Sequence, residues 1–346
     1  MEPVAERKRI KYLDALRGMT ITILVMVHVS GFCLNVEADT PSFIQYFNEF
    51  MLPMFFFISG FLCYRIGAHY DLHHIIVFLC KKFQILIIPT ATFFLVSVFV
   101  YHLNLIEEVF SDTKSGYWFT FVLFEFFCFY AMIRWLTLYL SINSLWEDFF
   151  LIVCGIVLFV ITIPSVYNHM VIESSILSLF CCRYWGYFLY FIVGILIKKH
   201  FVVFQLMLDK KIIVSCSLVI FFGLNITRDL VMSLHFNFFR LSTALSAIIV
   251  LFAFFRTNES LFINERNWSK YLCFVGRRTL DIYFIHYFLL PRNLSLLLDV
   301  FYEQPVPIIE LAVCLLLSIA IISVCLLIGI VLRQSPFLAL CLFGSK

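Results

Sequence analysis

Long apolar runs with few interruptions dominate the pattern of hydrophobic and polar positions along this chain. Most approach the roughly 20 residues that a helix needs to cross a bilayer, and they lack the strict alternation of a membrane strand. The pattern predicts an all-α, polytopic membrane protein with about ten transmembrane helices. The predicted spans are Leu16–Val36, Ile44–Tyr64, Phe83–Tyr101, Tyr117–Leu140, Phe149–Tyr167, Tyr184–Ile197, Ile212–Ile226, Phe238–Phe255, Tyr271–Leu290 and Ile308–Leu332.

The composition supports this class. The chain has 346 residues, of which 62% are hydrophobic and only 14% are charged, whereas soluble domains are about one quarter charged. The loops between the predicted spans are short, so we expect one integral-membrane domain over residues 1–346, with a short cytoplasmic tail over residues 1–13. We expect the protein to contact the lipid bilayer, and we do not expect it to bind nucleic acid.

Several common chemistries lack their sequence signatures. The twelve cysteines are scattered and show no Cys-x-x-Cys spacing, so we expect small buried apolar residues rather than metal ligands or disulfides. Glycine-rich phosphate loops and the Gly-x-Ser-x-Gly turn are also missing. A cosubstrate that carries a nucleotide would therefore have to be held by basic side chains.

Basic residues are concentrated in alternate loops. Four precede the first predicted span: Arg7, Lys8, Arg9 and Lys11. The loops after the second, sixth and eighth spans are also basic, whereas several intervening loops carry acidic residues. The positive-inside rule places both termini in the cytoplasm, which agrees with an even number of spans.

Two ionisable residues share one face of the first predicted span. The segment from Arg17 to His28 is apolar apart from these two ends and two threonines. Eleven residues of α-helix advance about 16 Å and turn about 20° past three full turns, so both side chains project to the same side. Ionisable groups inside a bilayer are costly and normally line a cavity, pair with a partner or take part in chemistry.

Each member of this pair has two interpretations. Arg17 either extends to the lipid headgroups, or is oriented by Asp14 toward an anionic ligand that enters from the cytosol. His28 either packs between helices or acts as a general base, since imidazole titrates near neutrality. In the functional interpretation, an anion binds near the cytoplasmic face and chemistry takes place about 16 Å deeper, which suits a long cosubstrate.

Other predicted spans carry polar residues that could join this pair. His286 lies eight residues after Arg278, which marks the cytoplasmic end of the ninth span. A second histidine at membrane depth suggests a cavity shared with His28. Lys81 and Lys82 enter the third span from the cytoplasm, and they either fix the topology or bind phosphate.

Five motifs, in order along the chain, resemble those of the membrane-bound acyltransferase-3 family. The first is Tyr12-Leu-Asp-Ala-Leu-Arg-Gly18 followed by His28, which resembles the family's Arg-x10-His hallmark. The other four are Phe55-Phe-Phe-Ile-Ser-Gly-Phe61, Gly116-Tyr-Trp-Phe119, Phe188-Leu-Tyr-Phe-Ile-Val-Gly194 and Gly276-Arg-Arg-Thr-Leu-Asp-Ile-Tyr-Phe-Ile-His286. The resemblance thus covers nearly all of the chain.

The resemblance implies an O-acetyltransferase of the bacterial inner membrane. It would move an acetyl group from cytosolic acetyl-CoA to a hydroxyl of a carbohydrate or glycolipid. His28 and Arg17 match the family's functional pair, and no metal is implied. The residues expected at the coenzyme are Arg17, Lys81, Lys82 and Arg278, and those expected to support the site are Asp14, Ser59, Tyr283 and His286.

One departure concerns the third span. Many members of the family carry Arg-x-x-Arg there, whereas this chain has Lys81-Lys-Phe-Gln84. Lysine supplies the positive charge but not the planar, bidentate donor fork of arginine. The contacts to the coenzyme's phosphates are therefore expected to differ in this chain.

Two other functional classes compete with the enzyme. A transporter or flippase of lipid-linked sugars would use Arg17 and His28 as a substrate and proton path, without an acyl donor. A purely structural membrane subunit would tolerate alanine at both positions. Within the enzyme class, His28 either takes the proton of an attacking hydroxyl or forms an acetyl-histidine intermediate.

Overall fold

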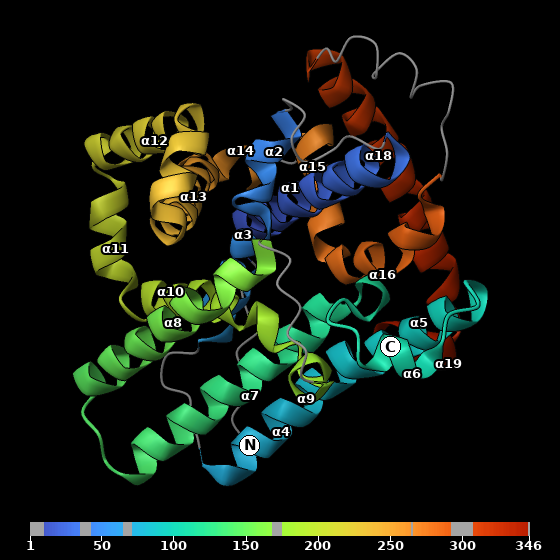
Figure 1. Ribbon diagram of the computed structural model, residues 1–346, viewed down its shortest axis with the longest axis horizontal. Coiled ribbons are helices and arrows are strands. Elements are labelled where there is room, and N and C mark those ends of the chain that lie inside the picture. The colour runs from blue at the N-terminus through green and yellow to red at the C-terminus, as the bar shows by residue number, and fades with distance from the viewer. Residues whose placement is uncertain are drawn as a thin grey trace.

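The computed structural model of the protein describes residues 10–34, 43–64, 71–167, 175–263, 266–291 and 307–344, except for the side chains of residues 164–167 and 175–176. Within these ranges the chain forms helices joined by turns, without a strand. The all-α class is therefore confirmed (Figure 1). Most of the predicted cytoplasmic tail, residues 1–9, lies outside the described residues.

The described residues form the following helices along the chain. In order they are α1 (Lys11–His28), α2 (Phe43–Asn48), α3 (Met51–Cys63), α4 (Leu72–Lys82), α5 (Ile88–Val100), α6 (Leu105–Val109), α7 (Trp118–Tyr139), α8 (Ser144–Tyr167), α9 (Ser175–Leu179), α10 (Phe188–Lys199), α11 (Phe201–Leu208), α12 (Lys211–Ile226), α13 (Arg228–Thr257), α14 (Glu259–Ile263), α15 (Asn267–Arg277), α16 (Thr279–Leu289), α18 (Pro307–Leu332) and α19 (Pro336–Phe343). Two π-helical segments, Val29–Cys33 and Phe83–Ile87, directly follow α1 and α4.

Among the described residues, seven helical segments are long and apolar enough to cross a membrane. They coincide with the first five predicted spans and with the eighth and tenth. The third and eighth begin well before the predicted residues, at Leu72 and Arg228. These seven segments identify the chain as a multi-pass membrane protein.

The other three predicted spans are short or broken. The sixth consists of Cys182–Lys199 and Phe201–Leu208, which meet at 95°, and the seventh is the 16-residue helix α12. The ninth is interrupted at Arg278, where the backbone leaves the helical region (φ −107°, ψ 21°), into two helices of 11 residues each. Within the part of the chain that the structure describes, it supports seven spans, or eight if the bent pair is one span; the count of ten stays a prediction.

Helix α1 runs through the middle of the bundle (Figure 1) and packs against α3, α13, α15, α16 and α18. Its crossing with α15 is unusually close because both helices place a glycine there. A Cβ on Gly276 would lie 1.7 Å from the carbonyl oxygen of Asp14, and one on Gly18 would lie 2.1 Å from that of Leu272. Small residues permit this backbone approach, and it fixes the neighbouring Arg17 within the bundle.

Helices α3 and α10 cross in the same way. A Cβ on Gly60 would lie 1.9 Å from the carbonyl oxygen of Phe191, and one on Gly194 would lie 2.1 Å from that of Phe57. The close approach of the two backbones at Gly60 leaves no space for a larger residue there. This crossing holds Ser59 near α1, since α1 also packs against α3.

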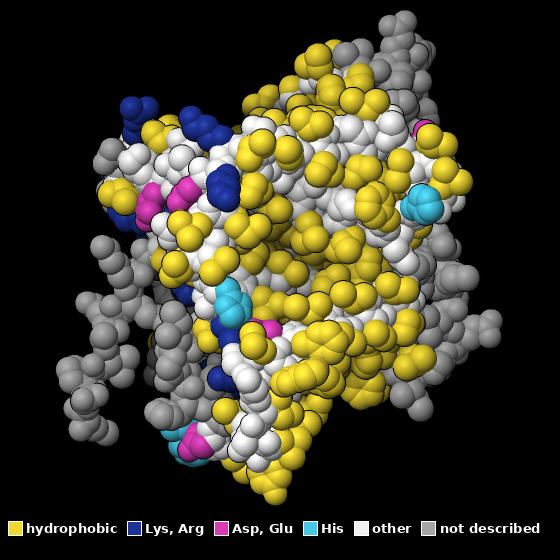
Figure 2. All heavy atoms as spheres, turned by 90° about the vertical axis from the view of Figure 1, so that its left-hand side faces the viewer, with side chains coloured by type: hydrophobic (Ala, Val, Ile, Leu, Met, Phe, Trp, Pro, Cys, Tyr) yellow, Lys and Arg dark blue, Asp and Glu magenta, His cyan; other side chains and the backbone are white. Residues whose placement is uncertain are grey.

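The exterior of the bundle is strongly apolar. Figure 2 shows a broad expanse of hydrophobic side chains on one face, with most of the Lys, Arg, Asp and Glu side chains gathered along one side of it. Phe99, on α5, and Ile226, at the end of α12, are 80% and 81% exposed. Soluble monomers rarely expose patches of this extent, so this surface fits contact with lipid.

Candidate functional site

The first helix presents two ionisable side chains, Arg17 and His28, on the face that its helical repeat predicts. The two threonines between them are turned back on the helix, since their hydroxyls donate to the carbonyl oxygens of Leu16 and Gly18 at 2.7 Å and 2.8 Å. The polarity of Thr20 and Thr22 is thus satisfied within the helix itself. The helix is regular as far as His28, so the spacing of about 16 Å between Arg17 and His28 follows from its rise.

A π-helical segment begins directly after His28. Residues Val29–Cys33 adopt the wider turn, and Ser30 in this segment donates a hydrogen bond of 2.8 Å to the Oε1 atom of Glu310 on α18. Both of these side chains are buried. π-Helical turns are rare and frequently lie at functional sites; here the turn is anchored to a neighbouring helix and fixes the end of α1.

The structure brings the two histidines together. The Nδ1 atom of His28 lies 2.8 Å from the Nε2 atom of His286, and the two ring planes are nearly parallel. His286 is fully buried, and its Nδ1 atom lies 2.8 Å from the carbonyl oxygen of Tyr283 and 3.0 Å from that of Ile282. Since a carbonyl only accepts, this Nδ1 atom carries the proton.

The tautomers of both rings follow from these contacts. In the neutral imidazole of His286, a proton on Nδ1 leaves Nε2 as an acceptor. His28 therefore donates from its own Nδ1 atom, and its Nε2 atom carries a lone pair. In the neutral form of His28, this tautomer leaves the Nε2 atom able to accept a proton.

Two aromatic residues surround the outer edge of the His28 ring. The Tyr287 hydroxyl lies 3.4 Å from the His28 Nε2 atom, and the two ring centroids are 4.9 Å apart. Phe32 packs edge-on against His28, with ring centroids 5.8 Å apart. His28 is only partly buried, so a ligand can approach its Nε2 atom beside Tyr287.

Tyr287 is absent from the residues predicted from sequence. Its signal is its place directly after His286, at the end of the Ile-Tyr-x-x-His motif. Adjacent residues of a helix point about 100° apart. His286 and Tyr287 can both reach His28 because the His28 ring lies alongside α16.

A cavity of about 210 Å³ lies at the Arg17 end of α1, and we call it the basic cavity. Arg17 and Lys82 line it and are its ionisable residues, and Ser59 and Thr279 add hydroxyl groups. Among the residues that the structure describes, no acidic side chain lines it. The π-helical segment Phe83–Ile87 follows Lys82 directly and contributes two more lining residues.

The remaining predicted coenzyme residues lie outside this cavity. Lys81 is exposed beside it. Arg278 contacts the Asp281 carboxylate at 3.4 Å, and the same carboxylate accepts two hydrogen bonds from Arg333, at 2.7 Å and 3.0 Å. Asp281 and Arg333 thus form a bidentate pair, which holds Arg278 at the break between α15 and α16.

The structure places two of the predicted supporting residues, Asp14 and Tyr283, at contacts between helices. Asp14 is buried at the crossing of α1 and α15, and its pairing with Arg17 stays a prediction. The Tyr283 hydroxyl donates to the carbonyl oxygen of Gly116 at 2.9 Å. Tyr283 therefore ties α16 to the start of α7.

A second cavity, of about 530 Å³, lies on the other side of the histidine pair. We call it the aromatic cavity because Phe32, Tyr101, Trp118 and Tyr287 line it. Within the described chain it shares no lining residue with the basic cavity. Arg17 lines the basic cavity, and Tyr287, which contacts His28, lines the aromatic cavity, so the two cavities lie toward opposite ends of α1.

A layer of three buried rings separates the cavities. Tyr283 packs against Tyr117 and Phe119, with ring centroids 6.3 Å and 5.7 Å apart. Phe119 lines the basic cavity, whereas Gly116, which accepts the Tyr283 hydrogen bond, lines the aromatic cavity. We call these three residues, Tyr117, Phe119 and Tyr283, the aromatic layer.

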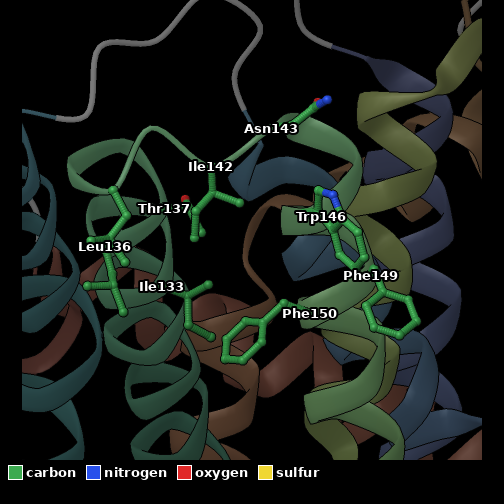
Figure 3. Close-up of a pocket in the computed structure, with 9 residues that line it drawn as sticks. Ile133, Leu136, Thr137, Ile142, Asn143, Trp146, Phe149 and Phe150 are labelled. Carbon is green, nitrogen blue, oxygen red and sulfur yellow. The ribbon is translucent and has the colours of Figure 1, made fainter.

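A third cavity, of about 650 Å³, lies between the ends of α7 and α8 (Figure 3). Its walls are mostly aliphatic and aromatic, with Trp146, Phe149 and Phe150 on one side, and Thr137 and Asn143 provide its polar groups. None of the described residues that line it is ionisable. A cavity of this kind suits apolar chains and offers no group for acid–base chemistry.

Comparison with known families gives one match. A family model described as an acyltransferase domain matches residues 10–330, which is most of the chain. No curated protein and no solved structure matches the chain.

Proposed function

Because the chain belongs to the acyltransferase-3 family, and is thus a membrane acyltransferase, we propose that it is an O-acetyltransferase. In this proposal it moves the acetyl group of cytosolic acetyl-CoA to a hydroxyl of a cell-surface or lipid-linked carbohydrate. Family membership favours this enzyme over a transporter, a flippase or a structural subunit.

The donor binds at the basic cavity. Two cationic side chains, Arg17 and Lys82, line this cavity, and none of its other described lining residues is charged, so it attracts the phosphates of the coenzyme. Arg17 can hold a phosphate through two parallel hydrogen bonds, whereas Lys82 acts as a point charge. The pantetheine arm then extends along α1 toward His28.

His28 acts as the general base. Its Nε2 atom takes the proton from the acceptor hydroxyl while the hydroxyl oxygen attacks the thioester carbonyl carbon. The carbon–sulfur bond breaks, an ester forms, and the coenzyme leaves as a thiolate. The proton passes from Nε2 to the thiolate sulfur, which returns His28 to its neutral form.

The observation that carries this proposal is the histidine pair. His286 is fully buried and bonded to two backbone carbonyls, so it accepts a hydrogen bond from His28 and leaves the His28 Nε2 atom with its lone pair. Helix packing alone does not require this order of donors. A base with a fixed tautomer, in contact with Tyr287 of the aromatic cavity, is what acyl transfer to a hydroxyl requires.

The orientation in the membrane follows from the charge pattern. With both termini in the cytoplasm of a bacterial inner membrane, the basic cavity faces the cytosol and the aromatic cavity faces outward. The acetyl group would then cross the membrane while the coenzyme stays inside.

The test uses the purified full-length protein in lipid nanodiscs with radiolabelled acetyl-CoA. We expect thioester cleavage and label transfer to cell-surface glycans. His28→Ala abolishes both because no base remains, and Arg17→Lys raises the KM for acetyl-CoA because the bidentate phosphate contact is lost. Circular dichroism and size-exclusion profiles establish that both variants fold.

The results separate the competing functions. Wild-type turnover in the His28→Ala variant would refute the role of His28. Absence of thioester cleavage by the wild-type protein, combined with uptake of lipid-linked sugar into vesicles, would favour the transporter.

A further inference from the structure

The aromatic cavity is built around a carboxylate. Glu108, at the end of α6, lines it together with Ser97, Thr113 and Ser115. The Glu108 Oε2 atom accepts a hydrogen bond of 2.8 Å from the Ser115 hydroxyl. The carboxylate is thus oriented at the cavity wall by a neighbouring side chain, with its second oxygen outside this contact.

The loop that carries Ser115 has an uncommon backbone. Lys114, Ser115 and Gly116 all have positive φ, at 44°, 53° and 93°. Residues other than glycine rarely adopt this conformation, which persists where the surroundings fix it and is concentrated at functional sites.

Three hydrogen bonds fix this loop. The Lys114 ammonium donates to the carbonyl oxygens of Val109 and Ser178, at 2.8 Å and 3.4 Å, and Tyr283 donates to Gly116 from the other side. The cavity rim is therefore held in place before any ligand arrives, as expected of a preformed binding site.

The rings around the cavity are also held in place. Trp118 stacks on Tyr184, with centroids 3.7 Å apart and planes 11° apart. The Tyr101 hydroxyl contacts the backbone carbonyl of Tyr287 at 3.5 Å. Aromatic faces carry partial negative charge, so they attract the electropositive C–H groups of a sugar ring.

The charge of the cavity selects among sugars. Of the described residues, Glu108 is the one acidic residue that lines it, and no Lys, Arg or His does so. The Lys114 ammonium is bonded to backbone carbonyls and lines a different pocket. A carboxylate accepts hydrogen bonds from neutral hydroxyls and repels uronates, sialates and phosphates.

The cavity adjoins the base. Tyr287 lines it and lies 3.4 Å from the His28 Nε2 atom, and Phe32 contacts both rings. A ring seated against Trp118 and Glu108 can therefore present one hydroxyl beside Tyr287 and His28.

We propose that the aromatic cavity is the acceptor site, that it binds an uncharged sugar ring, and that Glu108 determines this selectivity. The proposal rests on the proposed acetyltransferase function. Glu108 and the aromatic rings hold the sugar, and one of its hydroxyls reacts.

The test compares matched neutral and anionic acceptors. Wild-type protein in nanodiscs is incubated with labelled acetyl-CoA and the methyl glycosides of glucose, galactose and mannose, or of their 6-carboxylate forms. The wild type transfers label at least about tenfold more efficiently to the neutral glycosides, as kcat/KM, because the Glu108 carboxylate repels the anionic forms.

The variants test Glu108 itself. Glu108→Gln keeps the side-chain shape and raises the acceptor KM about tenfold, because a charge-assisted hydrogen bond becomes a weaker, neutral one. Glu108→Lys reverses the preference toward the anionic glycosides. Glu107→Gln is the matched control, since the Glu107 carboxylate bonds to Asn104 outside the cavity, and it leaves both KM values unchanged.

Each outcome has one meaning. Three outcomes would overturn the acceptor-site proposal and leave the acyltransferase function in place. The wild type could prefer the anionic glycosides, or the Glu108 variants could behave like Glu107→Gln. The third outcome is thioester cleavage without transfer to any of these sugars. Absence of thioester cleavage by the wild type would instead overturn the proposed function.

Discussion

Replacement of His286 by alanine tests whether the second histidine sets the tautomer of the first. The His286 Nε2 atom accepts a hydrogen bond from the His28 Nδ1 atom, and the two nitrogen atoms are 2.8 Å apart. Leaving a buried hydrogen-bond donor without an acceptor costs about 1–3 kcal/mol of free energy. A tenfold change in reaction rate corresponds to about 1.4 kcal/mol. If this cost falls on the transition state, kcat decreases about 5- to 150-fold in the His286→Ala variant.

The assay separates this role from simple packing. Initial rates of label transfer give kcat and the KM for acetyl-CoA, and we expect a loss in kcat with little change in KM, because the basic cavity lies at the other end of α1. The variant His286→Gln supplies an amide oxygen in place of Nε2. It recovers part of the lost kcat because His28 again has an acceptor for its Nδ1 proton.

Three results would contradict this reasoning. If His286→Ala turned over within about twofold of the wild type, the tautomer would not depend on His286. If Gln and Ala were equally impaired although both folded, the defect would arise from lost packing. A rise in KM alone would assign His286 to coenzyme binding.

Two further predictions concern the basic cavity and the helix crossing. Lys82→Ala raises the KM for acetyl-CoA more than its neighbour Lys81→Ala does, because Lys82 lines the basic cavity whereas Lys81 is exposed beside it; equal effects would contradict the assignment of the phosphate site. Gly276→Ala lowers the thermal unfolding temperature in detergent, because its Cβ would lie 1.7 Å from a backbone oxygen of α1. Gly223→Ala is the matched control, since nothing described lies within 4 Å of its Cβ, and alanine in a helix is about 0.5–1 kcal/mol more favourable than glycine.

The sequence predicts the membrane class and the first helix of the site well. Apolar run length depends on local composition alone, so most of the long spans are found at nearly the right residues. The relation between Arg17 and His28 is also local, because it depends only on the helical repeat within α1. The proximity of His286 could be suggested from its depth, but its hydrogen bond to His28 requires the packing of α16 against α1.

Other parts of the site depend on contacts between distant segments. The break at Arg278 has no proline. The Asp281 carboxylate, which contacts Arg278, is paired with Arg333, 52 positions further along the chain. Hydropathy therefore predicts one continuous span there. Glu108 lies in a short helix between predicted spans, where a carboxylate is typical of any exposed loop, and only the fold places it beside Trp118 and Tyr287.

The aromatic layer formed by Tyr117, Phe119 and Tyr283 has an electrical consequence. A water-filled path between the two cavities would let ions flow down the membrane potential, which is worth about 2.3 kcal/mol per elementary charge at 100 mV. Packed rings between the cavities would prevent such a leak. An acetyl group is neutral, so its passage from donor to acceptor moves no net charge through the field. In the proposed orientation, acetylation would therefore proceed equally well in energised and in depolarised cells.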